Sequence, residues 1–221
     1  MRSRQAARRI ADSAGISPGD TVLEVGTGLG ALTRELCGRG ARIISVERNG
    51  RLYGEASASL HCEGLELRRG DGFAVEDGFD VFVSNLPYSQ SRRAVEWLVQ
   101  RDFARGIVTV QKEFAAKLME ADPRRRRAIG VLAGHCFEMR VLFPVARSCF
   151  DPPPRVDSVV VELAKRRTIP GGVVRAVNGI FSYRRKTMRG IMKQFGREGG
   201  PGRLDDLSGD EIVGVAAEIA R

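Results

Sequence analysis

The architecture of this chain can be predicted outward from TVLEVGTGLG, the stretch Thr21–Gly30. Val22, Leu23 and Val25 form the continuous apolar run that is typical of a parallel strand covered on both faces. Three glycines follow at alternate positions, and they let the backbone turn tightly and approach a ligand closely. The stretch therefore predicts a buried strand, a ligand-binding turn and the start of a helix.

A second apolar run, ARIISVE (Ala41–Glu47), follows that helix and ends on an acidic residue. Glu47 lies 19 residues after Gly28. In folds of this kind an acidic residue about 20 residues after the glycine turn accepts hydrogen bonds from ribose hydroxyls. The two runs together predict a nucleotide-like cofactor on the glycine turn. A glycine-rich turn without a ligand remains the alternative on this motif alone.

Helical and strand patterns alternate along most of the chain. The predicted helices are Gln5–Gly15, Leu29–Cys37, Arg51–His61, Ser91–Arg101 and Lys112–Glu120. The predicted strands are Thr21–Val25, Ala41–Glu47, Leu65–Asp71, Phe79–Ser84, Gly106–Gln111, Cys136–Val145 and Val156–Ala164. This alternation predicts an α/β fold with a doubly wound, mostly parallel sheet of seven strands, the last two forming a hairpin.

The pattern changes from about Arg167, where short helical segments are separated by glycine-rich breaks. We therefore predict two domains, residues 1–166 with the sheet and residues 167–221 as a small helical domain.

Charge indicates the class of partner. A chain of 221 residues with a formal net charge of +9 favours a polyanion, and nucleic acid is the first candidate. Of its 36 basic residues 31 are arginine, which suits bidentate phosphate contacts, although a GC-rich coding bias would give the same preference.

Several other classes are disfavoured by composition. No apolar run is long enough to span a membrane, and the first ten residues lack an apolar signal-peptide region, so we expect a cytoplasmic protein. Four cysteines without a C-x-x-C pair and two histidines give no zinc spacing, so we expect reduced, mostly buried thiols and no metal. Nothing in the sequence demands more than a monomer.

A second motif, Asn85-Leu86-Pro87-Tyr88, follows the fourth predicted strand. It lies on the same carboxyl edge of the sheet as the glycine turn. The side-chain carbonyl of Asn85 and the main-chain carbonyl of Leu86 can accept the two N–H groups of an adenine amine, which frees the nitrogen lone pair. Pro87 stiffens the backbone, and Tyr88 offers a face on which a flipped base can stack. An ordinary turn with a half-buried tyrosine is the alternative.

Two further features fit the same hypothesis. Asp71, at the end of the third strand, can accept the amino group of a cofactor adenine, although a strand-ending aspartate is also common. Arginines gather in the run Arg124–Arg127, which suits RNA phosphate or a plain solvated loop. Another basic face, suited to phosphate or to a solvated helix end, consists of Arg184, Arg185, Lys186 and Arg189.

Taken together, the motifs resemble those of the ribosomal RNA adenine N6,N6-dimethyltransferases, which use S-adenosylmethionine. The resemblance covers nearly the whole chain. The matching segments are GDTVLEVGTGLGALT (Gly19–Thr33), Val46-Glu47, Gly70-Asp71, SNLPY (Ser84–Tyr88), QKEFAAKL (Gln111–Leu118), FDPPPRVDSVVV (Phe150–Val161) and FSYRRKTMR (Phe181–Arg189). The last two segments are similar to the small-subunit, kasugamycin-sensitivity branch.

The resemblance implies a Rossmann-like class I methyltransferase that dimethylates two adjacent adenines near the 3′ end of small-subunit rRNA during ribosome biogenesis, with the RNA or a pre-assembled subunit as partner. It implies residue roles as well. Cofactor contacts would come from Glu24 near the methionine amine, Gly26 and Gly28 at the methionine part, Glu47 at the ribose, Asp71 at the adenine, and Asn85. The target base would be held by Asn85, Leu86, Pro87 and Tyr88. RNA phosphates would meet Arg124, Arg125, Arg126, Arg127, Arg155, Arg184, Arg185, Lys186 and Arg189.

Departures from the family pattern leave alternatives open. The charged segments Ser89–Arg93 and Arg124–Arg127 differ from the usual sequences, which favours methylation of a different RNA adenine. The Gln-Asn-Phe-Leu segment that usually precedes the first helix is absent from this sequence, which favours a non-catalytic ribosome-assembly factor. DNA adenine methylation uses similar tetrapeptides, usually with an acidic first residue where this chain has Asn85.

Overall fold

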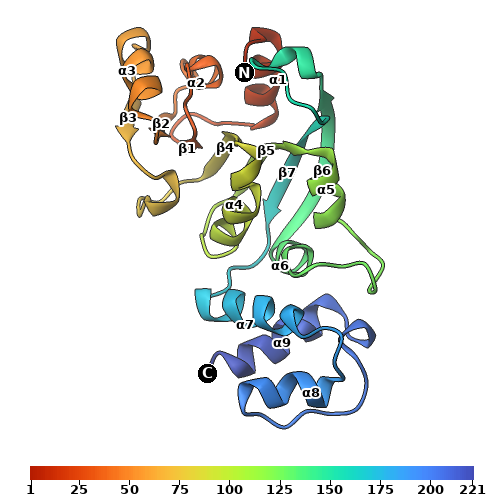
Figure 1. Cartoon of the computed structure of the whole chain (residues 1–221). Helices are drawn as coiled ribbons and strands as arrows, with labels where there is room; N and C mark the ends of the chain where they lie inside the picture. Colours follow the sequence, from red (N-terminus) through yellow and green to blue (C-terminus); the bar gives the residue numbers. More distant parts are fainter. The chain divides into compact units, whose positions relative to one another are not determined.

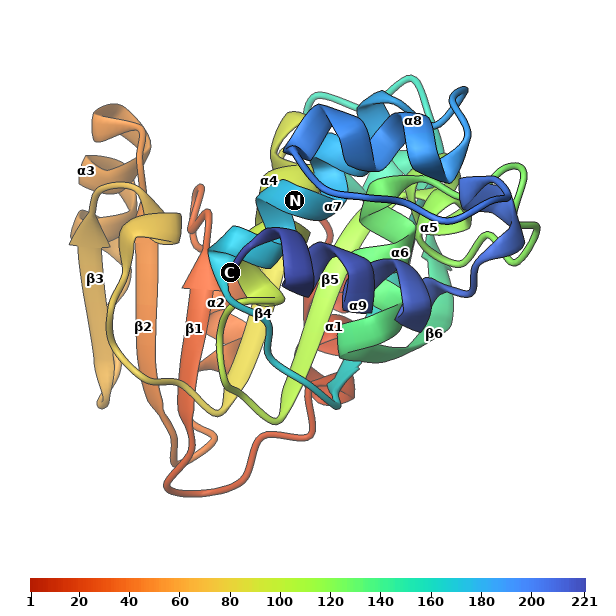
Figure 2. The ribbon, with the colours of Figure 1, turned by 90° about the horizontal axis from the view of Figure 1, so that it is seen from below.

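Seven strands form one sheet in the order β3-β2-β1-β4-β5-β7-β6 in the computed structural model, which describes residues 1–221 (Figures 1 and 2). The strands are β1 (Thr21–Val25), β2 (Arg42–Glu47), β3 (Leu65–Arg69), β4 (Val81–Asn85), β5 (Arg105–Gln111), β6 (Phe137–Val145) and β7 (Ser158–Lys165). The first five pair in parallel, and β7 runs antiparallel to β5. The predicted seven-stranded, mostly parallel sheet is confirmed.

Helices connect the strands as the alternation predicted. They are α1 (Arg4–Ser13), α2 (Ala31–Leu36), α3 (Gly50–Ser59), α4 (Ser91–Leu98), α5 (Lys112–Leu118), α6 (Ala128–Cys136), α7 (Gly171–Ser182), α8 (Met188–Met192) and α9 (Gly209–Ile219). Short 3₁₀ turns include η1 (Gly72–Ala74), η2 (Tyr88–Gln90), η3 (Arg147–Cys149) and η5 (Leu204–Asp206). None of these helices has the length and hydropathy that a transmembrane segment needs.

Helix α6 was not predicted from the sequence. Six of its nine residues are buried, and its sequence AIGVLAGHC is apolar on almost every side. Such a helix has no amphipathic period for a sequence pattern to reveal. It begins directly after the arginine run, and Arg124–Arg127 themselves lie in the loop that was predicted.

The chain packs into two compact units. Unit 1 comprises Met1–Ser91, Asp102–Ala115 and Met139–Lys165, and it holds almost the whole sheet. Unit 2 comprises Arg92–Arg101, Ala116–Glu138 and Arg166–Arg221, and within it α7 and α6 pack against α9. Unit 1 ends at Lys165, beside the predicted domain boundary between residues 166 and 167. The earlier segments Arg92–Arg101 and Ala116–Glu138, however, belong to unit 2 with the C-terminal helices. That residues 1–166 and 167–221 are separate domains stays a prediction.

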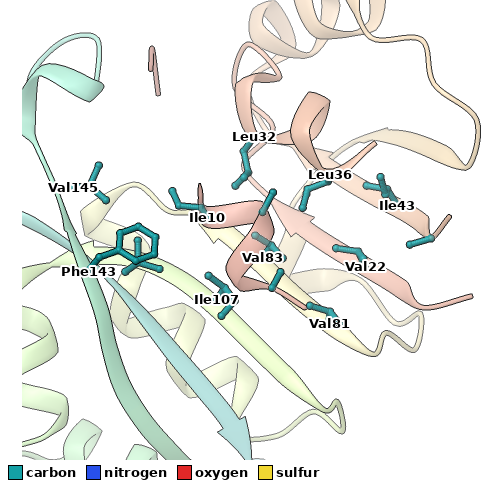
Figure 3. Packing of buried hydrophobic residues seen from close by; sticks show 14 of the residues in the cluster. Ile10, Val22, Leu32, Leu36, Ile43, Val81, Val83, Ile107, Phe143 and Val145 are labelled. Carbon is teal, nitrogen blue, oxygen red and sulfur yellow. The ribbon is translucent and has the colours of Figure 1, made fainter. Parts of the chain in front are cut away.

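The core of unit 1 lies between the sheet and the pair α1 and α2 (Figure 3). Alternate strand residues, such as Val22, Ile43 and Val83, place their side chains on one face. Ile10 of α1 and Leu36 of α2 pack onto that face, and all five side chains are buried. These helices therefore fix the strands whose ends carry the site.

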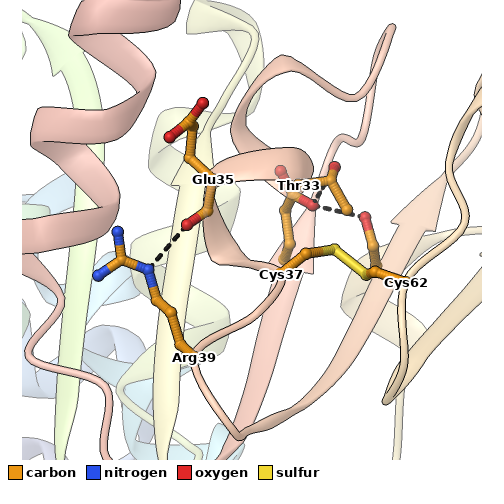
Figure 4. The surroundings of a disulfide bond; sticks show 7 residues. Thr33, Glu35, Cys37, Arg39 and Cys62 are labelled. Carbon is orange, nitrogen blue, oxygen red and sulfur yellow. Dashed lines mark hydrogen bonds between the residues drawn. A yellow bond between two sulfur atoms is a disulfide. The ribbon is translucent and has the colours of Figure 1, made fainter.

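A disulfide joins Cys37 to Cys62, which corrects the prediction that all four cysteines are reduced (Figure 4). Cys37 caps the end of α2, and Cys62 lies three residues after the end of α3. The two residues are 25 apart in sequence, but the fold brings their Cα atoms to 6.1 Å, within the range that a disulfide needs. Because only tertiary packing makes them neighbours, no sequence spacing revealed the pair. Cys136 is buried and Cys149 half-buried, and both are free thiols.

The disulfide generates the first prediction. Reduction, or the substitution Cys62→Ser, should lower the free energy of unfolding by about 3 kcal/mol, because the unfolded chain regains the freedom of the closed loop. Urea unfolding with and without a reductant checks it, and Cys149→Ser is the control that should respond to reductant like the native chain. Equal stability of the oxidised and reduced protein would contradict the prediction.

Candidate functional site

The glycine turn and the Asn85 motif meet at one edge of the sheet because β1 pairs with β4. The chain winds away from this pair in both directions, through β2 and β3 on one side and β5 on the other (Figure 2). The Ser84 hydroxyl of β4 donates to the main-chain carbonyl of Val25 at the end of β1. The carboxyl ends of strands at such a reversal point are where doubly wound folds bind ligands.

The glycines of the turn have two different tasks. Gly26, Gly28 and Gly30 have φ angles of +90°, +58° and +78°, which side chains rarely adopt. A Cβ atom at Gly26 or Gly28 would meet nothing within 4 Å, whereas one at Gly30 would lie 2.7 Å from the Leu60 side chain. Gly30 is therefore needed for packing, while Gly26 and Gly28 border open space beside the backbone where a ligand can approach.

The carboxylate of Glu47 holds this turn in place. Its Oε2 accepts the Gly28 N–H at 2.8 Å, and its Oε1 accepts the Asn49 N–H at 2.7 Å. Asn49 in turn caps α3 by accepting the N–H groups of Arg51 and Leu52. Each carboxylate oxygen keeps a second lone pair after these bonds, so Glu47 can accept two further hydroxyl groups.

Glu24 is a second buried carboxylate, and it lies on β1 two residues before Gly26. Its side chain is 1% exposed, and its Oε2 accepts the hydroxyls of Thr33 (2.7 Å) and Ser45 (2.6 Å). Thr27 of the glycine turn shares a hydrogen bond with the same Ser45 hydroxyl. The Glu24 Oε1 atom is buried without a hydrogen-bond partner in the protein. Burial raises the pKa of Glu24 to about 7, and the nearby Glu47 charge adds to this against the two hydroxyl bonds.

The raised pKa generates the second prediction. The pKa of Glu24 is about 7 in the folded state, against an ordinary value of 4.5 for the unfolded chain. Between pH 4.5 and about pH 7 the folded state therefore binds this proton more tightly, so the free energy of unfolding falls as pH rises through this range. Glu24→Gln keeps an oxygen that accepts both hydroxyls but cannot ionise. We expect the native chain to lose about 3 kcal/mol relative to this variant between pH 4.5 and pH 8.

Urea unfolding of both proteins without cofactor, at pH 5 and pH 8, measures this difference. Glu113→Gln, on the exposed side of α5, is the control for removing one carboxylate. Parallel pH profiles of the native chain and Glu24→Gln would contradict the prediction, because they would show that folding does not raise the pKa of Glu24.

Asp71 begins the short turn η1 directly after β3. Its Oδ1 accepts the Phe73 N–H at 3.1 Å, so the carboxylate is fixed at the start of that turn. Gly72 packs on Val25 of β1, where a Cβ atom would lie 2.6 Å from the valine side chain. This contact places Asp71 at the same edge of the sheet as the glycine turn.

The tetrapeptide Asn85-Leu86-Pro87-Tyr88 leaves the end of β4 in a fixed shape. Asn85 is half-buried, the Leu86 side chain is buried, and Pro87 lies exposed before η2. The Tyr88 hydroxyl shares a 2.6 Å hydrogen bond with Ser158, the first residue of β7. Ser158 was not predicted as a site residue, although it lies inside the segment FDPPPRVDSVVV and is the polar residue that begins an apolar strand.

The predicted RNA-binding arginines divide into two groups. Arg126 and Arg184 are half-buried and bind main-chain carbonyls within unit 2: Arg126 reaches Leu207 (2.6 Å), and Arg184 reaches Arg126 (2.7 Å). Arg184 also pairs with Asp205 at 2.6 Å. These two guanidinium groups therefore tie the arginine run to η5. The exposed members are Arg124, Arg125, Arg127, Arg155, Arg185, Lys186 and Arg189.

The side chains of the exposed basic residues form no hydrogen bonds to the main chain in the fold and can bind phosphate. Among them only Arg125 forms an ion pair with an acidic residue, Glu120, at 3.2 Å. Lys186 lies over the Tyr183 ring at 5.1 Å. A contact of any of these residues with RNA stays a prediction.

Comparison with protein families connects this geometry to known proteins. The family model described as "Ribosomal RNA adenine dimethylase" matches residues 1–199. A protein of Thermotoga neapolitana named "Ribosomal RNA small subunit methyltransferase A" is 36% identical over 196 residues, which cover 86% of this chain and 75% of that protein. A protein of the same name from Chelativorans sp. is 33% identical over 241 residues, covering 96% and 87%.

Solved structures agree with the fold. A dimethyladenosine transferase from Plasmodium falciparum superposes with a TM-score of 0.80 at 23% identity, covering 99% of this chain and 96% of that one. The 23S rRNA methyltransferase ErmE superposes with a TM-score of 0.69 at 25% identity, covering 100% and 99%. The similarity extends over both compact units.

Proposed function

Since the chain belongs to the ribosomal RNA adenine dimethylase family, we propose that its site transfers methyl groups from S-adenosylmethionine to the N6 atoms of two adjacent adenines near the 3′ end of small-subunit rRNA during ribosome biogenesis. The observation that carries this proposal is the meeting of the glycine turn and the Asn85 tetrapeptide at the β1–β4 pair. A cofactor site and a base site then share one edge.

The residues at this edge fit the cofactor. The open space beside Gly26 and Gly28 admits an extended ligand against the backbone. The remaining lone pairs of Glu47 match the two ribose hydroxyls, and the unpartnered Glu24 Oε1 is an acceptor for a cationic amine. Asp71 would receive the amino group of the cofactor adenine. When bound, S-adenosylmethionine supplies a methyl group on a positively charged sulfur.

The protein's own residues prepare the acceptor amine. The lone pair of an adenine amine is delocalised into the ring, so the amine is a poor nucleophile. The Asn85 side-chain oxygen and the Leu86 carbonyl accept its two N–H groups, which holds the nitrogen in a geometry with its lone pair free. Pro87 contributes no competing N–H donor. Tyr88 stacks on the flipped base, and its bond to Ser158 keeps the ring in position.

RNA affinity on this proposal comes from the exposed cations of both units. Arg155 of unit 1 and the exposed residues Arg124, Arg125 and Arg127 of unit 2 would contact phosphates, as would Arg185, Lys186 and Arg189. We assign Arg126 and Arg184 a supporting role, because their guanidinium groups already bind the backbone. The protein would act as a monomer on the RNA or on a partly assembled subunit.

Methylation of a different RNA adenine is the second candidate. The charged residues Arg92 and Arg93 follow the tetrapeptide closely, and they could change which RNA segment is accepted. A non-catalytic assembly factor is less favoured, because such a protein has no chemical need for Asn85, Glu47 and Asp71 together at one edge.

The third prediction tests the chemistry. Asn85→Ala removes one of the two acceptors for the target amine, and we expect methyl transfer to fall by about 100-fold or more. The assay measures transfer from labelled S-adenosylmethionine to undermodified small ribosomal subunits, with mass spectrometry of the digested nucleosides to identify dimethyladenosine.

Its control is Gln5→Ala on the exposed side of α1, which also removes one side-chain amide from unit 1 and should keep full activity. Calorimetry should show that both variants bind S-adenosylmethionine. Full transfer by Asn85→Ala would exclude the proposed role, and absence of transfer by the native chain would favour the assembly factor.

The fourth prediction separates the ring of Tyr88 from its hydroxyl. Tyr88→Phe keeps the stacking face and loses one hydrogen bond, so kcat/KM should fall about fivefold, corresponding to about 1 kcal/mol. Ser158→Ala removes the same bond from the other side and should match it. Tyr88→Ala also loses the stacking of about 1–3 kcal/mol and should be clearly slower. A Phe variant as slow as the Ala variant would give the hydroxyl itself a catalytic role.

A further inference from the structure

A basic groove lies between α1 and α2 of unit 1, outside the site described above. Five arginines line it, with a volume of about 800 Å³ between them. They are Arg2, Arg4, Arg8, Arg34 and Arg39. We call this feature the α1–α2 groove. None of its arginines is among the residues predicted to contact RNA.

The arginines come from regular positions on two packed helices. The residues of α1 that face the core are Ala7, Ile10 and Ala11. Arg4 and Arg8 lie on the opposite, outer side of the helix, where their i, i+4 spacing makes them neighbours and forms a basic stripe. The start of α1 is held firmly, because the N–H groups of Arg2 and Ser3 both donate to the Cys149 carbonyl, at 2.7 Å and 3.1 Å. The stripe therefore belongs to an ordered surface rather than a loose tail.

The far wall of the groove is equally fixed. Arg39 donates to the main-chain carbonyl of Glu35 at 2.7 Å, beside the disulfide at Cys37 (Figure 4). Arg34 donates to the Leu29 carbonyl (3.1 Å) and to the Ser59 hydroxyl (3.0 Å). These bonds orient the two guanidinium groups but do not neutralise their charge.

The acids of the groove are too few to balance the arginines. Glu35 pairs with Arg4 at 2.8 Å, and Asp12 pairs with Arg39 at 2.7 Å. Arg2, Arg8 and Arg34 have no acidic partner, so the groove keeps three uncompensated positive charges. The Arg4 side chain is 88% exposed even in its ion pair, and such an exposed pair is weak enough to be exchanged for another anion.

We propose that the α1–α2 groove binds the phosphate backbone of a second segment of the substrate RNA, away from the target adenine. This proposal rests on the proposed function, because that function makes RNA the substrate. Guanidinium groups bind phosphate in bidentate geometry, and protein–nucleic acid interfaces are rich in positive charge. Seven of the nine lining residues are charged, whereas the centre of a protein–protein interface is depleted in charge. The groove thus anchors RNA without reading its sequence.

The test uses Arg2→Gln combined with Arg8→Gln, since both side chains are exposed and neither has an acidic partner or a hydrogen bond in the fold. Affinity for RNA extracted from undermodified small subunits is measured by filter binding between 50 and 300 mM salt. We expect the affinity near 100 mM salt to fall about tenfold or more, and the slope of log affinity against log salt to flatten by about 1.5.

The matched control is Arg140→Gln combined with Arg147→Gln, which removes two charges from other elements of unit 1. Its RNA affinity and salt slope should stay close to those of the native chain. Calorimetry should show native S-adenosylmethionine binding for both double variants, which excludes unfolding as the cause of any loss.

Three outcomes would overturn the proposal. An unchanged salt slope in the groove variant places the RNA elsewhere. An equal loss in the control variant shows a general charge effect rather than a groove. Weaker binding to intact small subunits with unchanged binding to extracted RNA assigns the groove to a ribosomal protein. Methyl transfer by the native chain tests the proposed function separately, so the two failures can be told apart.

Discussion

The pairing of β1 with β4 is the constraint on which the rest of the site depends. The chain continues from β1 through β2 to β3 on one side of this pair and from β4 to β5 on the other, so the connections after β1 and β4 leave the pair in opposite directions at its carboxyl end. The glycine turn follows one strand and Asn85 ends the other. Parallel pairing of Val22–Glu24 with Val81–Val83 fixes the height of both motifs on the same edge. The glycine turn and the Asn85 tetrapeptide are therefore held at one edge with no hinge between them.

Two buried carboxylates lie at the turn and differ in how well their charge is stabilised by hydrogen bonds. Glu47 accepts main-chain N–H groups from the turn and from the segment leading into α3, and so links these two loops. Glu24 accepts hydroxyls only on Oε2, and burial raises its pKa. A positive group beside Glu24 would favour its ionised form. Binding of a cationic ligand should thus be coupled to proton release from the protein.

Most of the fold and the centre of the site were predictable, because they depend on local patterns. The apolar runs around Val22 and Ile43 and the residues that end each strand are visible in the sequence. Features that depend on tertiary neighbours were not. Cys37 and Cys62 approach only after α2 and α3 have packed. The half-buried Arg126 is indistinguishable in sequence from the exposed arginines beside it, and α6 lacks a polar face. The proposed residue roles rest on their placement at one edge and stay predictions until activity is measured.

The disulfide between Cys37 and Cys62 has a topological meaning beyond its effect on stability. It closes a covalent ring that contains β2 and α3, and therefore Glu47 and Asn49. A single cut of the backbone inside this ring leaves the two fragments joined through sulfur. While the bond is intact, the segment that carries Glu47 and Asn49 stays connected to the glycine turn even when the backbone within the ring is cut once.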